Sequence, residues 1–290
     1  MARPNPVTFF KQSLKSDSYY ADEIINIYLL RPIAAVIVWL LYPTRATPNY
    51  VTLFAICLGF AAAAVYVINT PAAIAVAGVL VCAKDIFDDA DGQLARAKEL
   101  YSRRGRFLDS IGDFVVDVAL FSAITYAVYQ TFPEITTIVL GFLSLLGITL
   151  RVSHHVFYQA SFLHIEERYK LNRIIDEITE DDRQGDPVAF RLQVIFNIIY
   201  TWQDRLMYRI DQWCRRGNPN DEHLRAWYSD KLGLRISGLL GFGTEFALLT
   251  VCSLFNKLHL YLILNVAAMN GIWIVSILYR RIVLAGNLKR

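Results

Sequence analysis

The sequence has little of what soluble or secreted enzymes usually contain. It has four cysteines in 290 residues and no C-x-x-C pair, so neither a zinc site nor a disulfide framework is indicated. Only 19% of the residues are charged, and residues 50–68 carry no charge at all. The first 20 residues lack an apolar core, so we expect no cleavable signal peptide. With 55% hydrophobic residues and a mean hydropathy of +0.35, the composition excludes an ordinary soluble domain.

Six apolar stretches are long enough to cross a bilayer. They are residues 50–69, 71–96, 106–131, 134–156, 236–255 and 258–279. We therefore predict an all-α fold, a polytopic membrane helical bundle of about six transmembrane helices, as a single integral membrane domain over residues 1–290. Residues 50–156 would hold the first four spans, and residues 236–280 would hold the last two.

Two segments outside these stretches have patterns of their own. Residues 20–42 fit either an extra span or an amphipathic helix in the interface, because residues 25–42 are apolar apart from Arg31. Residues 157–235 form a polar insert. Within it, residues 188–214 repeat apolar and aromatic side chains at helical spacing, which is typical of an amphipathic helix.

Loop charges predict the orientation of the chain. Lysine and arginine gather before residue 50, after the second stretch and at the C-terminus, whereas the opposite loops offer only Lys257. Because basic loops stay on the cytoplasmic side, both termini, the loop after the second stretch and the polar insert would face the cytoplasm, in an inner or cytoplasmic membrane. The formal net charge of +3 reflects the same basic rim, which suits anionic lipid headgroups and is no sign of nucleic-acid binding.

Four aspartates lie at helical spacing in the second and third stretches, where carboxylates are costly and usually functional. They are Asp88, Asp91, Asp109 and Asp113. Two antiparallel helices joined by the polar loop of residues 97–104 would point them at each other. Because facing carboxylates repel each other in low dielectric, they must take up protons or hold cations. An all-carboxylate set suits Mg²⁺ or Mn²⁺ rather than zinc, and two such ions about 4 Å apart form the usual clamp for phosphoryl displacement.

Small and basic residues lie beside these carboxylates. Gly92 and Ala95 leave the helix face bare, so that a bulky ligand can come close to the backbone. Arg96 borders that face, and the basic run of residues 103–106 adds positive charge suited to phosphate oxygens. Gly105 begins the stripe of the second helix.

At these positions the sequence resembles the CDP-alcohol phosphotransferase family, whose signature is D-x2-D-G-x2-A-R-x8-G-x3-D-x3-D. Every signature position is filled, by Asp88, Asp91, Gly92, Ala95, Arg96, Gly105, Asp109 and Asp113. Residues 47–52, T-P-N-Y-V-T, resemble the start of a span in many members. The resemblance covers about residues 20–155 and favours an interfacial helix for residues 20–42. Residues 157–235 resemble no family that we can name.

The resemblance implies a transferase that moves a substituted phosphate from a CDP-alcohol to an acceptor alcohol and releases CMP. We expect CDP-diacylglycerol as the donor, in phospholipid biosynthesis, with CDP-choline, CDP-ethanolamine or CDP-inositol as the soluble alternatives. Two metal ions would be held by Asp88, Asp91, Asp109 and Asp113. Asp113 would also take the proton of the acceptor as general base. Cytidine and phosphate would be bound by Gly92, Ala95, Arg96 and Gly105.

Two other functional classes are left open by the sequence. A carboxylate-lined transporter or proton channel would use the aspartates as a relay, but it would need neither the bare face at Gly92 nor a nucleotide. An inactive lipid-binding scaffold would not need all eight signature residues intact. The expected partners are the donor, the acceptor and the lipid bilayer, and not nucleic acid, while association into a homodimer is left open.

Other polar residues in the spans have weaker patterns. Asp85 and Asp89 fall off the signature and are interpreted as partners of Lys84 or Arg96. Asp117, one turn beyond the last signature aspartate, is expected to hydrogen-bond to the site.

The end of the fourth stretch and the start of the fifth add four more polar residues. Arg151, His154 and His155 would either bind an anionic acceptor or anchor the fourth span at the interface. Glu245 is a lone carboxylate in the fifth stretch, and we expect it to be a buried partner in helix packing.

Overall fold

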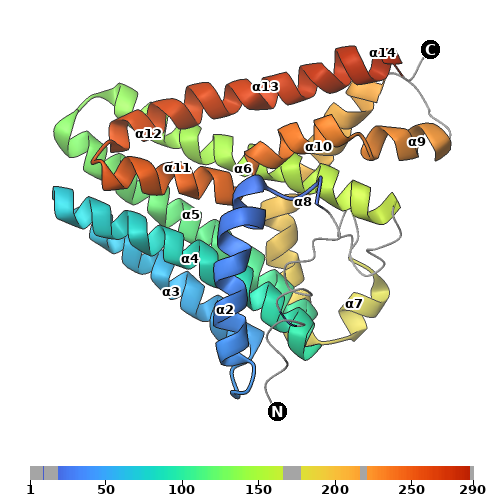
Figure 1. Cartoon of the computed structure of the whole chain (residues 1–290), viewed down its shortest axis with the longest axis horizontal. Coiled ribbons are helices and arrows are strands. Elements are labelled where there is room, and N and C mark those ends of the chain that lie inside the picture. Colours follow the sequence, from blue (N-terminus) through green and yellow to red (C-terminus); the bar gives the residue numbers. More distant parts are fainter. Residues whose placement is uncertain (1–8, 10–18, 166–177, 216–220, 288–290) are drawn as a thin grey trace.

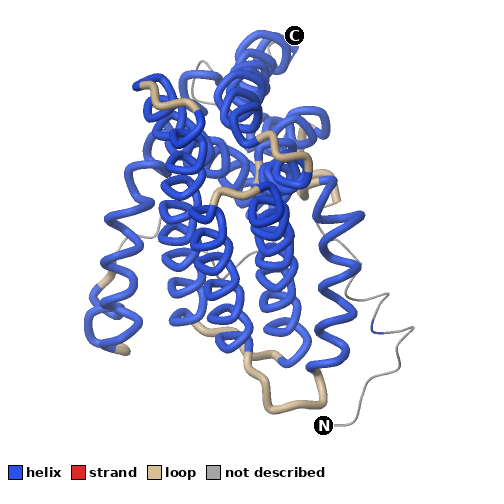
Figure 2. Tube along the Cα trace, turned by 90° about the vertical axis from the view of Figure 1, so that its left-hand side faces the viewer, coloured by secondary structure: helices blue, strands red, loops and turns tan. Residues whose placement is uncertain are grey.

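The computed structural model describes residue 9 and residues 19–165, 178–215 and 221–287. Every regular element in this part of the chain is helical, as predicted (Figure 2). The long helices are α3 (Pro48–Ile68), α4 (Pro71–Lys98), α5 (Arg103–Thr131), α6 (Ile135–Ile165) and α8 (Pro187–Arg215). The shorter ones are η1 (Asn26–Leu30), α2 (Arg31–Leu41), α7 (Glu180–Gln184), α9 (Asp221–Tyr228), α10 (Lys231–Ser237), η2 (Gly238–Leu240), α11 (Phe242–Leu254), α12 (Leu258–Leu264), η3 (Asn265–Met269), α13 (Asn270–Leu278), η4 (Tyr279–Leu284) and α14 (Ala285–Asn287).

Length and composition identify four or five membrane spans where the sequence predicted six. Four helices are long and apolar enough to cross a bilayer: Pro48–Ile68, Arg103–Thr131, Ile135–Ile165 and Leu258–Leu284. Lys231–Leu240 and Phe242–Leu254, bent by 43° at their junction, count as a fifth if they form one span. Helix α4 is not among them because its second half is charged, yet it packs against both α3 and α11. The prediction of a polytopic helical membrane bundle is confirmed, but the predicted number of six spans is not.

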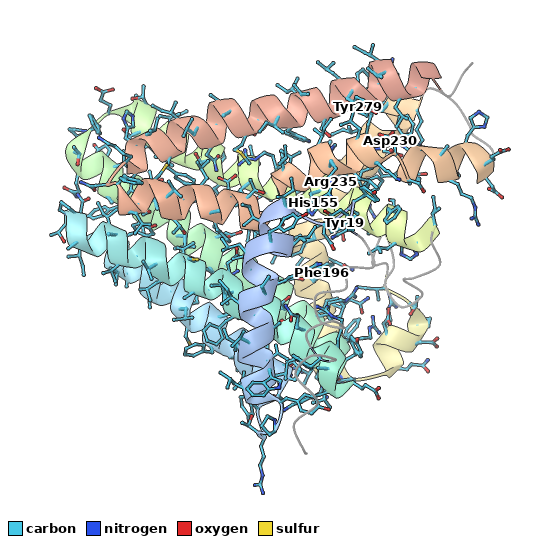
Figure 3. The ribbon with its side chains drawn as sticks, in the orientation of Figure 1. Tyr19, His155, Phe196, Asp230, Arg235 and Tyr279 are labelled. Atoms are coloured by element: carbon cyan, nitrogen blue, oxygen red, sulfur yellow. The ribbon has the colours of Figure 1, made fainter. Side chains whose placement is uncertain are left out.

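The N-terminal helix is too short for an ordinary span. It consists of five residues of η1 and eleven of α2, and at 1.5 Å per residue it is about 24 Å long, against a hydrocarbon core of about 30 Å. It crosses α4 (Figure 1) and is tied down at its start, where Arg31 pairs with Asp22 at 2.7 Å. The guanidinium of Arg235 lies 4.5 Å from the ring centre of Tyr19 (Figure 3). The placement of the N-terminal helix in the membrane interface stays a prediction.

Helix α3 is the common neighbour of the two helices that carry the signature. It packs closely against both α4 and α5, which have few direct backbone contacts with each other in the described structure. The close approach of α3 to α5 depends on small residues, because a Cβ on Gly59 would lie 2.3 Å from Val116. In Figure 1, α3, α4 and α5 run side by side, while α6 and α13 diverge from them. Side chains of α4 and α5, their aspartates among them, nevertheless lie close together beside α3.

The link between α4 and α5 is shorter than the predicted loop of residues 97–104. Helix α4 ends at Lys98, and the next residue, Glu99, adopts a left-handed conformation with a φ of 56°. Helix α5 begins after Ser102, whose hydroxyl accepts a hydrogen bond of 2.9 Å from the Gly105 amide. Both helices thus continue without a break from this turn to their carboxylates.

The described part of the insert packs against the bundle. The ring of Phe196 on α8 (Figure 3) lies 5.3 Å from that of Phe107 on α5. Asp211, fully buried on α8, accepts hydrogen bonds from four side chains: Tyr158, Trp227, Tyr228 and Arg215. These contacts join α8 to α6 and α9, and the contact between Phe196 and Phe107 joins it to α5.

Candidate active site

Three signature carboxylates come together between α4 and α5. Asp88, Asp91 and Asp109 each offer an oxygen, and these oxygens all lie within 4.8 Å of one another. Thr52 on α3 donates its hydroxyl to Asp91 and so orients that carboxylate. One oxygen of Asp109 is buried and has no hydrogen-bond partner in the described structure. A buried oxygen without a donor, inside a set of three carboxylates, fits a hard divalent cation such as Mg²⁺ or Mn²⁺.

The fourth signature carboxylate is held by a lysine. The ammonium of Lys84 lies 2.6 Å from Asp113 and 3.9 Å from Asp88. Lys84 is only 1% exposed, and its ammonium also lies 5.8 Å and 5.4 Å from the ring centres of Phe242 and Phe246. One buried positive charge therefore balances part of the carboxylate cluster. The sequence contains a signal for this contact, since Lys84 is one helical turn before Asp88.

Three aspartates outside the signature surround this cluster. In the described structure Lys84 forms its ion pairs with Asp88 and Asp113, so the prediction that it pairs with Asp85 or Asp89 is wrong. Asp85 and Asp117 are buried, and an oxygen of Asp117 lacks a hydrogen-bond partner among the described residues. The hydrogen bond predicted for Asp117 is therefore not present among the described residues.

The two signature glycines have different surroundings. A Cβ on Gly92 would meet only the Arg96 guanidinium, at 3.6 Å, so this helix face is open, and its use by a nucleotide stays a prediction. A Cβ on Gly105 would lie 2.7 Å from Asn49 and 2.9 Å from Ser102. Gly105 therefore permits close packing of α5 against the start of α3. Its predicted contact with the nucleotide stays a prediction.

Two arginines predicted to meet phosphate are occupied by the insert. Arg103 pairs with Asp182 at 2.5 Å, and Arg104 pairs with Asp186. The Arg103 hydrogen bond holds the pKa of Asp182 well below its usual range, and the Arg104 hydrogen bond lowers the pKa of Asp186 in the same way. These arginines thus join the turn before α5 to α7 and α8. The sequence could not show this, because the acids lie about 80 positions away.

The polar residues of α6 are buried inside the bundle. Arg151 is fully buried, forms an ion pair with Glu245 at 2.8 Å and donates a hydrogen bond of 2.6 Å to the side-chain oxygen of Asn270. The prediction that Glu245 is a buried packing partner is confirmed. His154, also buried, hydrogen-bonds Ser276 at 3.1 Å. Arg151 therefore links α6 to α11. This packing role differs from both predictions, which were that Arg151 binds an anionic acceptor or anchors the span at the interface.

Comparison with known proteins agrees with this geometry. The CDP-alcohol phosphatidyltransferase family matches residues 45–214, more than half of the chain, so the family match extends into the insert and past the predicted limit near residue 155. A protein of Thermococcus kodakarensis (strain ATCC BAA-918 / JCM 12380 / KOD1), called bifunctional IPC transferase and DIPP synthase, is 34% identical over 103 residues. These residues are 36% of this chain and 22% of that protein, so the chain spans about a fifth of the length of this relative.

Members of the matched family transfer a substituted phosphate from a CDP-alcohol with release of CMP, and they commonly use divalent metal ions. The carboxylate cluster and the apolar spans of this chain fit both properties. The chain therefore belongs to the CDP-alcohol phosphatidyltransferase family of membrane enzymes.

Proposed function

We propose that this enzyme transfers a substituted phosphate from CDP-diacylglycerol to an acceptor alcohol and releases CMP. The observation that carries the proposal is the group of three carboxylates, with oxygens within 4.8 Å of one another, beside the open helix face at Gly92. The apolar spans around them support a donor with acyl chains, since such a donor reaches the site from the bilayer. A soluble CDP-alcohol is the alternative donor.

The carboxylates would hold two Mg²⁺ or Mn²⁺ ions. Asp88, Asp91 and Asp109 have the oxygens for one ion, and Asp113 would share the second with them. When bound, such ions neutralise the diphosphate and stabilise the CMP that leaves. The acids of α4 and α5 lie close enough to one another for a single ion to contact both helices.

The side chains of this chain perform the remaining steps. The acceptor oxygen forms a bond to the phosphorus while the bond from phosphorus to the CMP oxygen breaks. Asp113 takes the acceptor proton, and Lys84 at 2.6 Å keeps the carboxylate turned toward the cluster. Gly92 and Ala95 leave room for the cytidine. Arg96, which is exposed beside this face, would bind a phosphate oxygen.

The orientation and domain organisation are parts of the same proposal. The basic residues of the turn before α5 and of the C-terminus favour a site that faces the cytoplasm. Residues 1–290 would form one integral membrane domain, with residues 157–235 as a cytoplasmic insert. The contacts of α8 with α5 and α6 support an insert that belongs to the same folded unit.

The test is a panel of CDP-alcohols and acceptor alcohols, offered to the full chain in detergent and scored by CMP release. We expect release from CDP-diacylglycerol with Mg²⁺ or Mn²⁺ and none with excess chelator. Asp88→Asn should lose activity, whereas the matched control Asp181→Asn, on the exposed side of α7, should keep it. Release of CMP from soluble CDP-alcohols alone would overturn the assignment of CDP-diacylglycerol as the donor. Full turnover in chelator would overturn the metal site, and no release from any donor would overturn the function.

A further inference from the structure

Helix α8 crosses the bundle at one depth. Tyr200 of α8 donates a hydrogen bond of 2.7 Å to the Ser110 carbonyl on α5, and Gln203 of α8 accepts one from Ser153 on α6. At 1.5 Å per residue, these contacts lie about 32 Å from the far end of α5 and about 27 Å from the far end of α6. The hydrocarbon core of a bilayer is about 30 Å thick. With the far ends of α5 and α6 at the opposite interface, both crossings would lie at the membrane interface on the carboxylate side.

The face of α8 that points away from the bundle mixes apolar and basic side chains. Its exposed residues include Val188, Arg191, Ile195, Ile198, Trp202, Arg205, Arg209 and Trp213. These recur every three or four residues and form one stripe along the helix. Ile198 is 72% exposed and Trp202 is 47% exposed, which is unusual for large apolar side chains in water. Neither acid of α8, Asp204 or Asp211, is exposed, so the stripe carries positive charge only.

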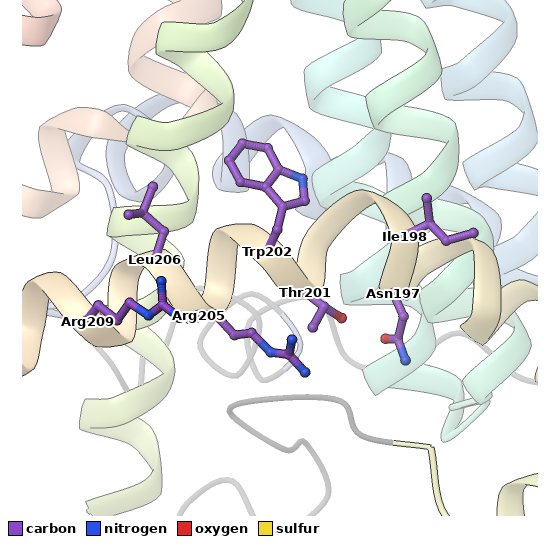
Figure 4. Close-up of a pocket in the computed structure, with 7 residues that line it drawn as sticks. All are labelled: Asn197, Ile198, Thr201, Trp202, Arg205, Leu206 and Arg209. Atoms are coloured by element: carbon purple, nitrogen blue, oxygen red, sulfur yellow. The ribbon is translucent and has the colours of Figure 1, made fainter.

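The stripe has an apolar edge and a polar edge. A cavity of about 550 Å³ lies along it, lined by Asn197, Ile198, Thr201, Trp202, Arg205, Leu206 and Arg209. In Figure 4, Trp202 and Leu206 project to the side of α8 on which the spans rise, and Asn197 and Arg205 project to the opposite side. An interfacial helix has this arrangement, with its apolar edge toward the acyl chains and its basic edge toward the headgroups. Tryptophan at this depth is typical of membrane interfaces.

We propose that the stripe is a lipid-docking surface, by which α8 lies in the interface of the carboxylate-side leaflet and binds anionic phospholipid. Trp202 and Leu206 contact acyl chains, and Arg205 and Arg209 contact headgroup phosphates. Two independent observations point to this occupant: the depth of α8 on the spans, and the excess of arginine over exposed acid along its outer face. The surface lies on the outer side of α8 and is independent of the proposed transfer reaction.

Quenching of tryptophan fluorescence by brominated lipid tests the depth. The full chain is placed in phosphatidylcholine nanodiscs with increasing fractions of brominated phosphatidylglycerol. The signal of Trp202 is the difference between the wild type and Trp202→Phe, and the control is the corresponding difference for Trp227, which is 2% exposed. We expect Trp202 to be quenched several-fold more strongly than Trp227. Equal quenching of the two would overturn the proposal.

Charge variants test the headgroup contacts. Arg205→Gln with Arg209→Gln should lower the association of phosphatidylglycerol relative to phosphatidylcholine, by up to about fivefold for each arginine. The matched control is Arg225→Gln, an exposed arginine of α9. An equal loss in the control would overturn the arginine contacts. If the double variant unfolds, Arg205→Lys keeps the charge and must keep the lipid preference.

The same nanodiscs distinguish lipid from the other occupants of the surface. A Trp202 that is quenched by aqueous acrylamide and not by brominated lipid would place the stripe in water. A Trp202 that is shielded from both quenchers would place it against a protein. Either result would overturn the proposal.

Discussion

Gly92→Leu tests most directly whether the open face of α4 holds a nucleotide. A Cβ at this position would meet a single neighbour within 4 Å, the Arg96 guanidinium at 3.6 Å. The arginine is exposed and its flexible side chain can move away. The added leucine therefore occupies space that the folded chain leaves open, and the free enzyme should accept it.

The expected effects on stability and on binding have opposite signs. Leucine is a better helix former than glycine by about 0.7 kcal/mol, so the free energy of unfolding should stay the same or rise. If the cytidine occupies this space, the leucine overpacks the site, which costs about 1–3 kcal/mol of binding. That cost corresponds to a loss of CDP affinity of about 5- to 150-fold. A proton channel has no use for the space and would tolerate the change.

Two matched glycines provide the controls. Gly271 on α13 has no neighbour within 4 Å of an added Cβ, so Gly271→Leu should leave CDP affinity unchanged and, like Gly92→Leu, keep or raise stability. A Cβ on Gly59 would lie 2.3 Å from Val116, so Gly59→Leu should unfold the bundle. The assay measures CDP affinity by calorimetry and the thermal unfolding midpoint in the same detergent. Unchanged CDP affinity in Gly92→Leu would remove this glycine from the nucleotide site, and loss of the fold would give it a packing role instead.

Three further perturbations address charged groups. Lys84→Met should cost about 3–5 kcal/mol of unfolding free energy without metal, because it leaves buried Asp113 unpaired, and the loss should be smaller in saturating Mg²⁺. The control is Lys257→Met, at an exposed lysine, and equal losses for Lys84→Met with and without Mg²⁺ would contradict the reasoning. Asp113→Asn should lower CMP release by about 10²- to 10⁴-fold and keep CDP-alcohol binding, whereas retention of half the activity would assign the base to another residue, with Asp117 the first to test. Burial raises the pKa of Glu23 from 4.5 to about 8, so the folded state binds its proton more tightly than the unfolded state, and stability should fall by up to about 1.4 kcal/mol per pH unit as pH rises through this range. Glu23→Gln should remove that slope in thermal unfolding at pH 5 to 9, and an unchanged slope would refute the assignment.

The local features of the site could be predicted from the sequence. A helix repeats every 3.6 residues, so the spacing of Asp88 and Asp91 places both carboxylates on one stripe wherever the helix lies. The same argument groups Asp109 with Asp113. Carboxylate oxygens prefer hard cations, so the chemistry of the site follows from residue types alone. The long apolar stretches likewise indicate membrane helices, because no other element satisfies its own backbone hydrogen bonds in lipid.

Long-range partners could not be predicted in this way. Arg103 and Arg104 are as basic as any phosphate ligand, and only the position of the insert shows that Asp182 and Asp186 hold them. Arg151 at the end of an apolar stretch looks like an interfacial anchor, yet in the folded bundle it is fully buried against α11. In each case the partner lies far away in the chain, and residue type alone does not select it.

The sequence by itself determined the fold class, the family signature and the kind of metal that the carboxylates would accept, since these depend on composition and on the period of single helices. Only the tertiary structure decided that α3 packs against both α4 and α5, that Lys84 holds Asp113, and that α8 crosses α5 and α6. These features arise from helix packing, where small residues such as Gly59 set how closely two helices approach. That packing brings together side chains whose separation in the sequence contains no sign of their contact.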